Sequence, residues 1–115
     1  MWNSEVKPEG RIITVGLSPA WDVSCRGRGL DWGLHAEIDE QVIRPAGKAL
    51  NVSSALAWMG CESTAAGLWG SEDHGQMCSN VARWGRRVQV RMTRAKGHTR
   101  LNVTVADRRG RREMH

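Results

Sequence analysis

The most restrictive feature of the sequence is an amphipathic segment that lies between two short apolar runs. Apolar side chains recur in this segment at the spacing of one helix face, at Ala49, Val52, Leu56 and Met59. Gly60 stands where a glycine commonly ends a helix. The run at 11–17 is rich in β-branched residues and is typical of a buried strand, and a second short strand is predicted at 63–69. A strand, a helix and a strand in this order predict a parallel α/β sheet with right-handed crossovers.

The same alternation continues along the chain. A second amphipathic helix, closed by a glycine, is predicted from apolar residues at helical spacing, Met77, Val81 and Trp84. Residues 88–92 and 101–105 alternate between apolar and polar side chains, which predicts two more strands. In sheets of this kind ligands bind at the carboxyl ends of the strands, so the residues directly after each strand are the candidates for a site.

Two further stretches, 22–28 and 37–44, are predicted to be strands that need not lie in the main sheet. Turn-forming residues follow at 107–110, and 112–115 has the pattern of the return strand of a hairpin. A natural domain seldom ends within such a strand, because its edge would be short and poorly anchored. We therefore expect the sequence to be part of a longer domain.

The composition is that of one small soluble globular unit, with 40% apolar and 25% charged residues. The net charge of +5 comes mostly from arginine, and part of it is concentrated at Arg108–Arg112. A cluster this short favours a solvated turn between two strands. The alternative is a small basic module that binds the phosphates of nucleic acid.

The cysteines and the N-terminus indicate the compartment. Cys25, Cys61 and Cys78 are odd in number and form no C-x-x-C pair, so neither a disulfide framework nor a zinc site is predicted. Residues 1–10 have the pattern of a polar leader, expected to be disordered, without an apolar signal segment. No run approaches the roughly 20 apolar residues of a membrane span. We expect a cytoplasmic protein with no membrane partner.

Two segments carry polar side chains at the predicted ligand edge of the sheet. Pro19 stiffens the turn after the first strand and would hold Asp22 near this edge, where a carboxylate can accept hydrogen bonds from adjacent sugar hydroxyls. Gly47 lets the backbone approach a ligand, and Asn51 in the first helical turn offers a donor and an acceptor to a polyol. Taken singly, each feature is also typical of an ordinary loop or helix start. The spacing of a phosphate-binding P-loop is absent.

Together with later segments, these residues resemble a known family. The segments occur in the order Ile13–Asp22 (ITVGLSPAWD), Gly47–Val52 (GKALNV), Trp58–Gly60, Ala66–Gly70 and Thr99–Val103. This order resembles the N-terminal portion of the PfkB, or ribokinase-like, carbohydrate kinases. Within the family it is most similar to the subgroup of 1-phosphofructokinases and tagatose-6-phosphate kinases.

The resemblance implies an α/β fold, the N-terminal part of a ribokinase-like three-layer sandwich, over residues 11–115. The strands at 22–28 and 37–44 would form a small β-lid that closes over the sugar and often makes a homodimer contact. The lid matters physically because excluding water protects a transferring phosphoryl group from hydrolysis.

The resemblance also implies a set of substrate-binding residues, namely Asp22, Gly47, Lys48, Asn51, Arg100 and Asn102. Asp22 and Asn51 would converge on one pocket and bind hydroxyls of the sugar. Gly47 would add a backbone contact, and Arg100 would reach a phosphate or another polar end of the sugar. Ala46 and Ala49 depart from the family, which has glycines at these two places.

The machinery of phosphoryl transfer is not found in the sequence. The resembled family uses a later G-A-G-D segment, whose Asp is the general base and whose backbone N–H groups bind phosphates. No such segment occurs, so no catalytic residue and no metal ligand is assigned, and the chain alone is expected to be inactive. ATP and Mg²⁺ would serve the full-length parent, whose partner is a sugar or sugar phosphate. A non-catalytic sugar-binding or dimerisation remnant is the alternative, and the basic nucleic-acid-binding module is less favoured.

Overall fold

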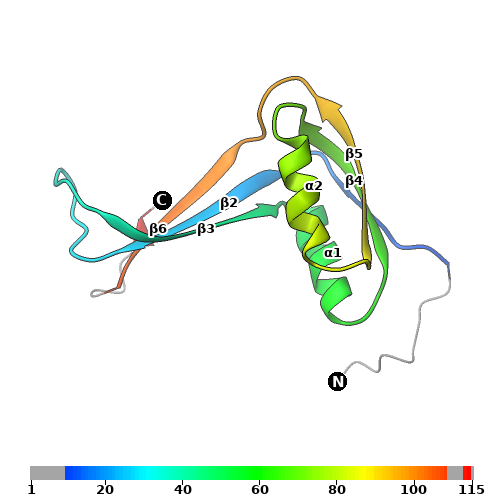
Figure 1. The fold of residues 1–115 in the computed structure, drawn as a ribbon, viewed down its shortest axis with the longest axis horizontal. Coiled ribbons are helices and arrows are strands. Elements are labelled where there is room, and N and C mark those ends of the chain that lie inside the picture. Colours follow the sequence, from blue (N-terminus) through cyan, green and yellow to red (C-terminus); the bar gives the residue numbers. More distant parts are fainter. Residues whose placement is uncertain (1–9, 109–112, 115) are drawn as a thin grey trace. The chain divides into compact units, whose positions relative to one another are not determined.

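The computed structural model describes residues 10–108 and 113–114, which form two compact units (Figure 1). The first unit holds the described residues up to Ala20 together with Pro45–Arg100. The second unit holds Trp21–Arg44 and the described residues from Leu101 onward. Among these described residues no helix has the length and apolar character needed to cross a membrane.

The first unit is built on a parallel sheet with the strand order β1-β4-β5. Its strands are β1 (Ile13–Gly16), β4 (Ser63–Gly70) and β5 (Val88–Ala95), and its helices are α1 (Lys48–Trp58) and α2 (His74–Ala82). Both neighbouring pairs, β1 with β4 and β4 with β5, run parallel. The predicted alternation of strands and helices in a parallel sheet is thereby confirmed.

One face of this sheet is buried and the other is exposed. On the buried face, Ala65 and Trp69 are at most 1% exposed, because α1 and α2 pack against it. On the opposite face, Ile13 and Val15 are 60% and 66% exposed. The predicted strand at 11–17 is found as β1, but of its residues only Thr14 is buried, so the prediction that the strand is buried was wrong for the others. Successive residues of β1 point to opposite faces of the sheet, and only one of these faces is covered among the described residues.

Three hydroxyl groups join the helix to the sheet inside the first unit. The Ser53 hydroxyl of α1 lies 2.8 Å from that of Thr14 on β1 and 2.8 Å from that of Ser63 on β4. All three residues are buried, and Ser53 is 0% exposed. Each hydroxyl therefore replaces the hydrogen bonds to water that it loses on folding.

The predicted end of α1 is confirmed. Gly60 has a φ of 90°, its N–H bonds the carbonyl of Ala57 at 3.0 Å, and the N–H of Cys61 bonds the carbonyl of Leu56 at 2.8 Å. These are the two bonds of a Schellman motif, whose left-handed position favours glycine.

The predicted buried faces of the helices are only partly correct. The buried residues of α1 are Ala49, Leu50, Ser53 and Ala57. Val52, which belongs to the apolar helix face read from the sequence, is 50% exposed, so this face is only partly buried. In α2, Met77 and Val81 are buried as predicted, and Trp84 lies beyond the last helical residue.

The second unit contains a four-stranded sheet with the order β3-β2-β6-β7. Its strands are β2 (Ala20–Gly27), β3 (Ile38–Ala46), β6 (Leu101–Asp107) and β7 (Glu113–Met114). The strands predicted near 22–28 and 37–44 are found in this sheet, outside the main one. The predicted hairpin return is confirmed by the antiparallel pairing of β7 with β6, while Arg112 and His115 lie outside the described residues.

The end of β6 is fixed by contacts inside the second unit. The buried carboxylate of Asp107 accepts a hydrogen bond from the Leu30 N–H at 2.9 Å. The guanidinium group of Arg108 forms ion pairs with Asp39, at 3.1 Å, and with Glu40. This arginine of the basic cluster is thus neutralised locally, whereas Arg109–Arg112 lie outside the described residues.

Candidate functional site

Asp22 and Asn102 are partners on adjacent strands of the second sheet. β2 and β6 are parallel, and their register places Asp22 opposite Asn102. The Asn102 side-chain amide donates to the Asp22 carboxylate at 3.5 Å, a distance at the weak end of hydrogen bonding. The register is the stronger observation, since it places both side chains on one sheet face whatever the rotamers. An acceptor and a donor group are thereby held side by side.

The face that carries this pair is polar. Ser24 and Thr104, the next residues on the same face, are also register partners, whereas the intervening Val23 is buried. A carboxylate, an amide and two hydroxyl groups therefore occupy neighbouring positions. These groups can donate and accept hydrogen bonds at once, as the recognition of a polyol requires.

Gly47 begins α1 in the first unit, as its N-cap, with a φ of 116°. A Cβ atom at this position would lie 3.0 Å from the Cα of Pro19 and 3.5 Å from the carbonyl oxygen of Ser18. The turn after β1 therefore packs directly against the helix start, and a side chain here would be strained as well as crowded. The N–H of Asn51 makes the first helical bond, to the Gly47 carbonyl, at 2.9 Å.

Lys48 and Asn51 follow Gly47 with exposed side chains. No side chain caps the start of α1, so the first N–H groups of the helix are not satisfied by a capping side chain. Ala49 is accommodated because Gly16 faces it. A Cβ at Gly16 would lie 2.9 Å from the Cβ of Ala49.

Arg100 contacts the same turn after β1. Its Nε donates to the Pro19 carbonyl at 3.2 Å and its Nη2 donates to the Ser18 carbonyl at 3.2 Å. The guanidinium group thus holds two successive carbonyl groups. A contact between Arg100 and a sugar phosphate stays a prediction.

The structure brings the predicted residues together in two sets. Gly47 and Arg100 meet at the turn after β1, and Lys48 and Asn51 continue from Gly47 along α1. Asp22 and Asn102 form the other set, in the second unit. The convergence of Asp22 and Asn51 on one pocket stays a prediction, because these two residues belong to different units.

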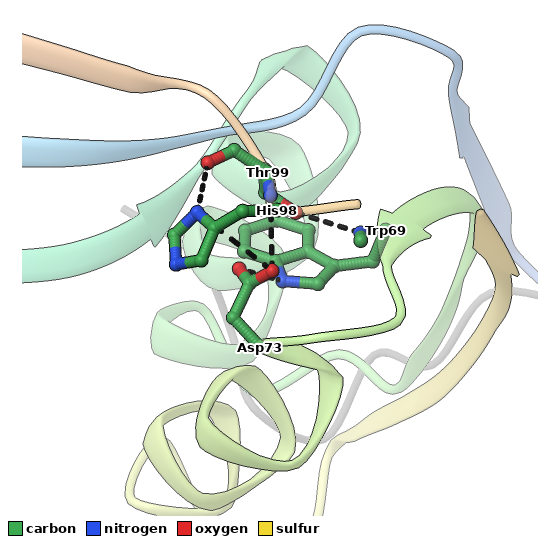
Figure 2. A network of polar contacts seen from close by, with 5 residues as sticks. Trp69, Asp73, His98 and Thr99 are labelled. Carbon is green, nitrogen blue, oxygen red and sulfur yellow. Dashed lines mark hydrogen bonds and ion pairs between the residues drawn. The ribbon is translucent and has the colours of Figure 1, made fainter. Parts of the chain in front are cut away.

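A buried polar network close to Arg100 was not predicted from the sequence (Figure 2). The carboxylate of Asp73, which is 1% exposed, accepts hydrogen bonds from the Trp69 indole N–H at 2.8 Å and from the Thr99 N–H at 2.9 Å. The hydroxyl of Thr99 in turn accepts the Gly70 N–H at 2.7 Å. Asp73 stands at the N-cap of α2, which sequence patterns would assign to capping, but its side chain makes no cap bond.

An open cavity of about 430 Å³ lies elsewhere in the first unit. It is found at the amino ends of the three parallel strands, and it is lined by Arg11, Arg86, Arg87, Arg91, Glu62 and neighbouring polar residues. None of the six predicted substrate-binding residues lines it. Within residues 10–108 and 113–114, no group of three or more His, Cys, Asp or Glu side chains is arranged to hold a metal ion.

Comparison with known sequences identifies a family and a relative that the chain resembles. Residues 13–114 match the model of the pfkB family carbohydrate kinases. The chain is similar to 1-phosphofructokinase of Vibrio cholerae serotype O1, with 28% identity over 100 residues that cover 87% of this chain and 31% of that protein.

Solved structures share the fold. Phosphofructokinase-2 from Escherichia coli, solved in complex with fructose-6-phosphate, matches with a TM-score of 0.80 and 26% identity over 90% of this chain and 34% of that one. A possible 1-phosphofructokinase from Thermotoga maritima matches with a TM-score of 0.80 and 23% identity over 91% of this chain and 34% of that one. The predicted α/β, ribokinase-like fold is confirmed, and the chain spans about a third of the length of these relatives.

Proposed function

We propose, because the chain belongs to the pfkB family of carbohydrate kinases, that it supplies the sugar-binding part of an enzyme that phosphorylates a sugar or sugar phosphate. The reaction is transfer of a phosphoryl group from ATP to an alcohol group. The names of the relatives, 1-phosphofructokinase and phosphofructokinase-2 with fructose-6-phosphate, make fructose phosphates the first ligands to test.

The pairing of Asp22 with Asn102 is the observation that carries this proposal. A carboxylate that only accepts hydrogen bonds stands beside an amide that also donates, on a polar sheet face. Vicinal hydroxyl groups of a sugar can donate to the first and accept from the second. We assign both side chains to sugar hydroxyls.

The turn after β1 and the start of α1 support the proposal from the first unit. Gly47 exposes backbone at a helix start, where N–H groups favour oxygen ligands, and Asn51 follows one turn later. Lys48 and Arg100 add positive charge near this turn, which suits a phosphorylated sugar. We assign these four residues to the substrate as well.

Titration of the chain with fructose 6-phosphate and fructose 1-phosphate, followed by ¹H–¹⁵N NMR, tests this assignment. Asp22→Asn is expected to weaken binding by about tenfold or more, because a neutral amide loses charge-assisted acceptance from a hydroxyl. Asp31→Asn is the matched control, since its amide oxygen can still accept the Trp32 N–H that the carboxylate binds. No binding by the unmodified chain, or equal affinity in both variants, would contradict the proposal.

The chemistry of ATP and Mg²⁺ is not assigned to this chain. The described residues hold no acidic cluster suited to Mg²⁺, and the sequence contains no G-A-G-D segment for the phosphates. We therefore expect no ADP release from the 115-residue chain with any hexose or hexose phosphate, and ADP release from the full-length parent. Turnover by the chain alone would refute the first expectation, and an inactive parent would favour the non-catalytic alternative.

We propose that the partner is a second copy of the chain, which forms a homodimer through the second sheet. Alternate positions on β2 and β6 form an apolar face opposite the polar one, as the register of Val23 with Val103 shows. On this face Leu101 and Val103 are 55% and 45% exposed, whereas Val23 is 5% exposed. A second copy of the chain would cover these two side chains and leave Asp22 and Asn102 on the other face to bind the sugar.

A further inference from the structure

The path of the loop between β5 and β6 is fixed by the turn between β4 and α2. The backbone N–H of Thr99 donates to Asp73, and the hydroxyl of Thr99 accepts the N–H of Gly70. The turn also binds the loop through the Glu72 N–H, which donates to the carbonyl of Gly97 at 3.2 Å. Three hydrogen bonds therefore tie the two segments together.

Asp73 is the centre of this connection (Figure 2). One carboxylate oxygen accepts from the Trp69 indole and the other from Thr99, so both oxygens are used. The His98 ring lies nearby, with Nδ1 3.9 Å from the Asp73 carboxylate and 2.6 Å from the Thr99 carbonyl. A carboxylate that is 1% exposed needs hydrogen-bond partners for its oxygens, and the directions of these partners in turn fix its orientation.

Arg100 is the next residue along the chain, and it leads away from this network to the turn after β1. Since Thr99 is held on both its N–H and its hydroxyl, the backbone of Arg100 begins at a fixed point. The guanidinium group then donates to the carbonyls of Ser18 and Pro19, the two residues against which Gly47 packs. Contacts therefore run without a gap from Asp73 to the start of α1.

We propose that Asp73 is a positioning residue, which through Thr99 holds Arg100 on the turn after β1 and so sets the start of α1. The positioning itself is independent of any ligand. Its consequence for affinity rests on the proposed function, since Gly47, Asn51 and Arg100 are assigned there to the sugar. Asp73 touches no substrate in this proposal and acts only through Thr99 and Arg100.

The direct readout is the Nε–H signal of Arg100 in ¹H–¹⁵N NMR spectra. In the unmodified chain this proton is hydrogen-bonded to Pro19, so we expect slow exchange with water. In Asp73→Asn one oxygen is replaced by an NH₂ group that cannot accept, and we expect the exchange to speed up by about tenfold or more. Glu72→Gln is the matched control, because this neighbouring carboxylate is exposed, and it is expected to leave the signal unchanged.

A second pair of variants, at Thr99, tests the same connection if Asp73→Asn folds poorly. Thr99→Val removes the hydroxyl that accepts the Gly70 N–H, whereas Thr99→Ser keeps it. We expect the Arg100 signal to change in the valine variant and to be retained in the serine variant. Ser53→Ala, which removes buried hydrogen bonds elsewhere in the first unit, controls for a general loss of stability.

Sugar affinity separates this inference from the proposed function. If fructose phosphates bind, Asp73→Asn is expected to weaken binding by about tenfold without contacting the ligand, as misplaced binding groups do. If no sugar phosphate binds the unmodified chain, the proposed function fails. The Arg100 signal still tests whether Asp73 positions Arg100. An Arg100 signal that is unchanged in both Asp73→Asn and Thr99→Val would overturn the inference.

Discussion

Gly70 shows how closely the segments around Asp73 approach one another. Its N–H donates to Thr99, and a Cβ atom at this position would lie 2.6 Å from the Gly97 carbonyl oxygen, 2.6 Å from the Thr99 nitrogen and 2.7 Å from a carboxylate oxygen of Asp73. Two of these three atoms belong to the backbone, which cannot move aside as a flexible side chain can. The absence of a side chain is therefore a condition for the whole network.

We expect Gly70→Ala to lower the free energy of unfolding by about 2–4 kcal/mol, because the added methyl group must push the loop away from Asp73. Gly75→Ala is the matched control. It lies in α2 with nothing within 4 Å of an added Cβ, and alanine there is expected to stabilise by about 0.5–1 kcal/mol. Urea unfolding measures both, and equal stability of the two variants would show that the loop has room to relax.

The residues of the candidate site differ in how far the sequence could predict them. Asp22 could be singled out because it follows a proline turn. Gly47 could be singled out because it is a glycine directly before a helical pattern. Asp73 could not, since one partner, Thr99, is 26 positions away and nothing local indicates that the two meet. Only the folded chain brings such groups together.

Among the elements, α1 has an end that the sequence predicts and a buried face that it does not. The end depends on Gly60 alone, which is a local signal. The face depends on the sheet, which presents Gly16 and hydroxyl groups and so selects the small residues Ala49 and Ser53 over the more apolar Val52. Local patterns also could not predict which strand pairs with β6, because alternation of apolar and polar residues predicts a strand without showing which sheet it joins.

Gly60→Ala tests the end of α1. We expect a loss of about 1–2 kcal/mol in the free energy of unfolding, because alanine is disfavoured at a φ of 90° and the Schellman bonds would weaken. Ser54→Ala in the middle of the same helix is the control and is expected to be neutral or slightly stabilising, given the helix propensity of alanine. Thermal unfolding followed by circular dichroism measures both, and no difference between them would contradict the role of Gly60.

At the scale of the whole molecule, two sheets leave apolar side chains exposed. In the first unit these include Ile13 and Val15, on a parallel sheet of a kind that is ordinarily covered on both faces. In the second unit they include Leu101 and Val103, on strand β6, whose opposite face is polar where it pairs with β2. Only the second sheet also carries candidate sugar-binding residues, so covering its apolar face leaves a possible site open.

We expect Val103→Lys to shift a homodimer towards monomer, because a charged side chain on the apolar face would be buried without a partner. Thr104→Lys, on the opposite face of the same strand, is the matched control and is expected to leave association unchanged. Sedimentation velocity over a range of protein concentrations measures the effect. A dimer that persists in the Val103 variant, or that is lost equally in both, would exclude this face as the interface.

The hydroxyl triad of Thr14, Ser53 and Ser63 determines where α1 sits along its own axis. Apolar burial is non-directional, so the small apolar side chains alone would fix the position of the helix less sharply than hydrogen bonds do. A shift would carry Ser53 away from the other two hydroxyls and leave them buried without partners, at a cost of about 1–3 kcal/mol each. These three hydroxyl groups thus select one position of α1 along its axis. They thereby also set the position of Asn51 relative to the sheet.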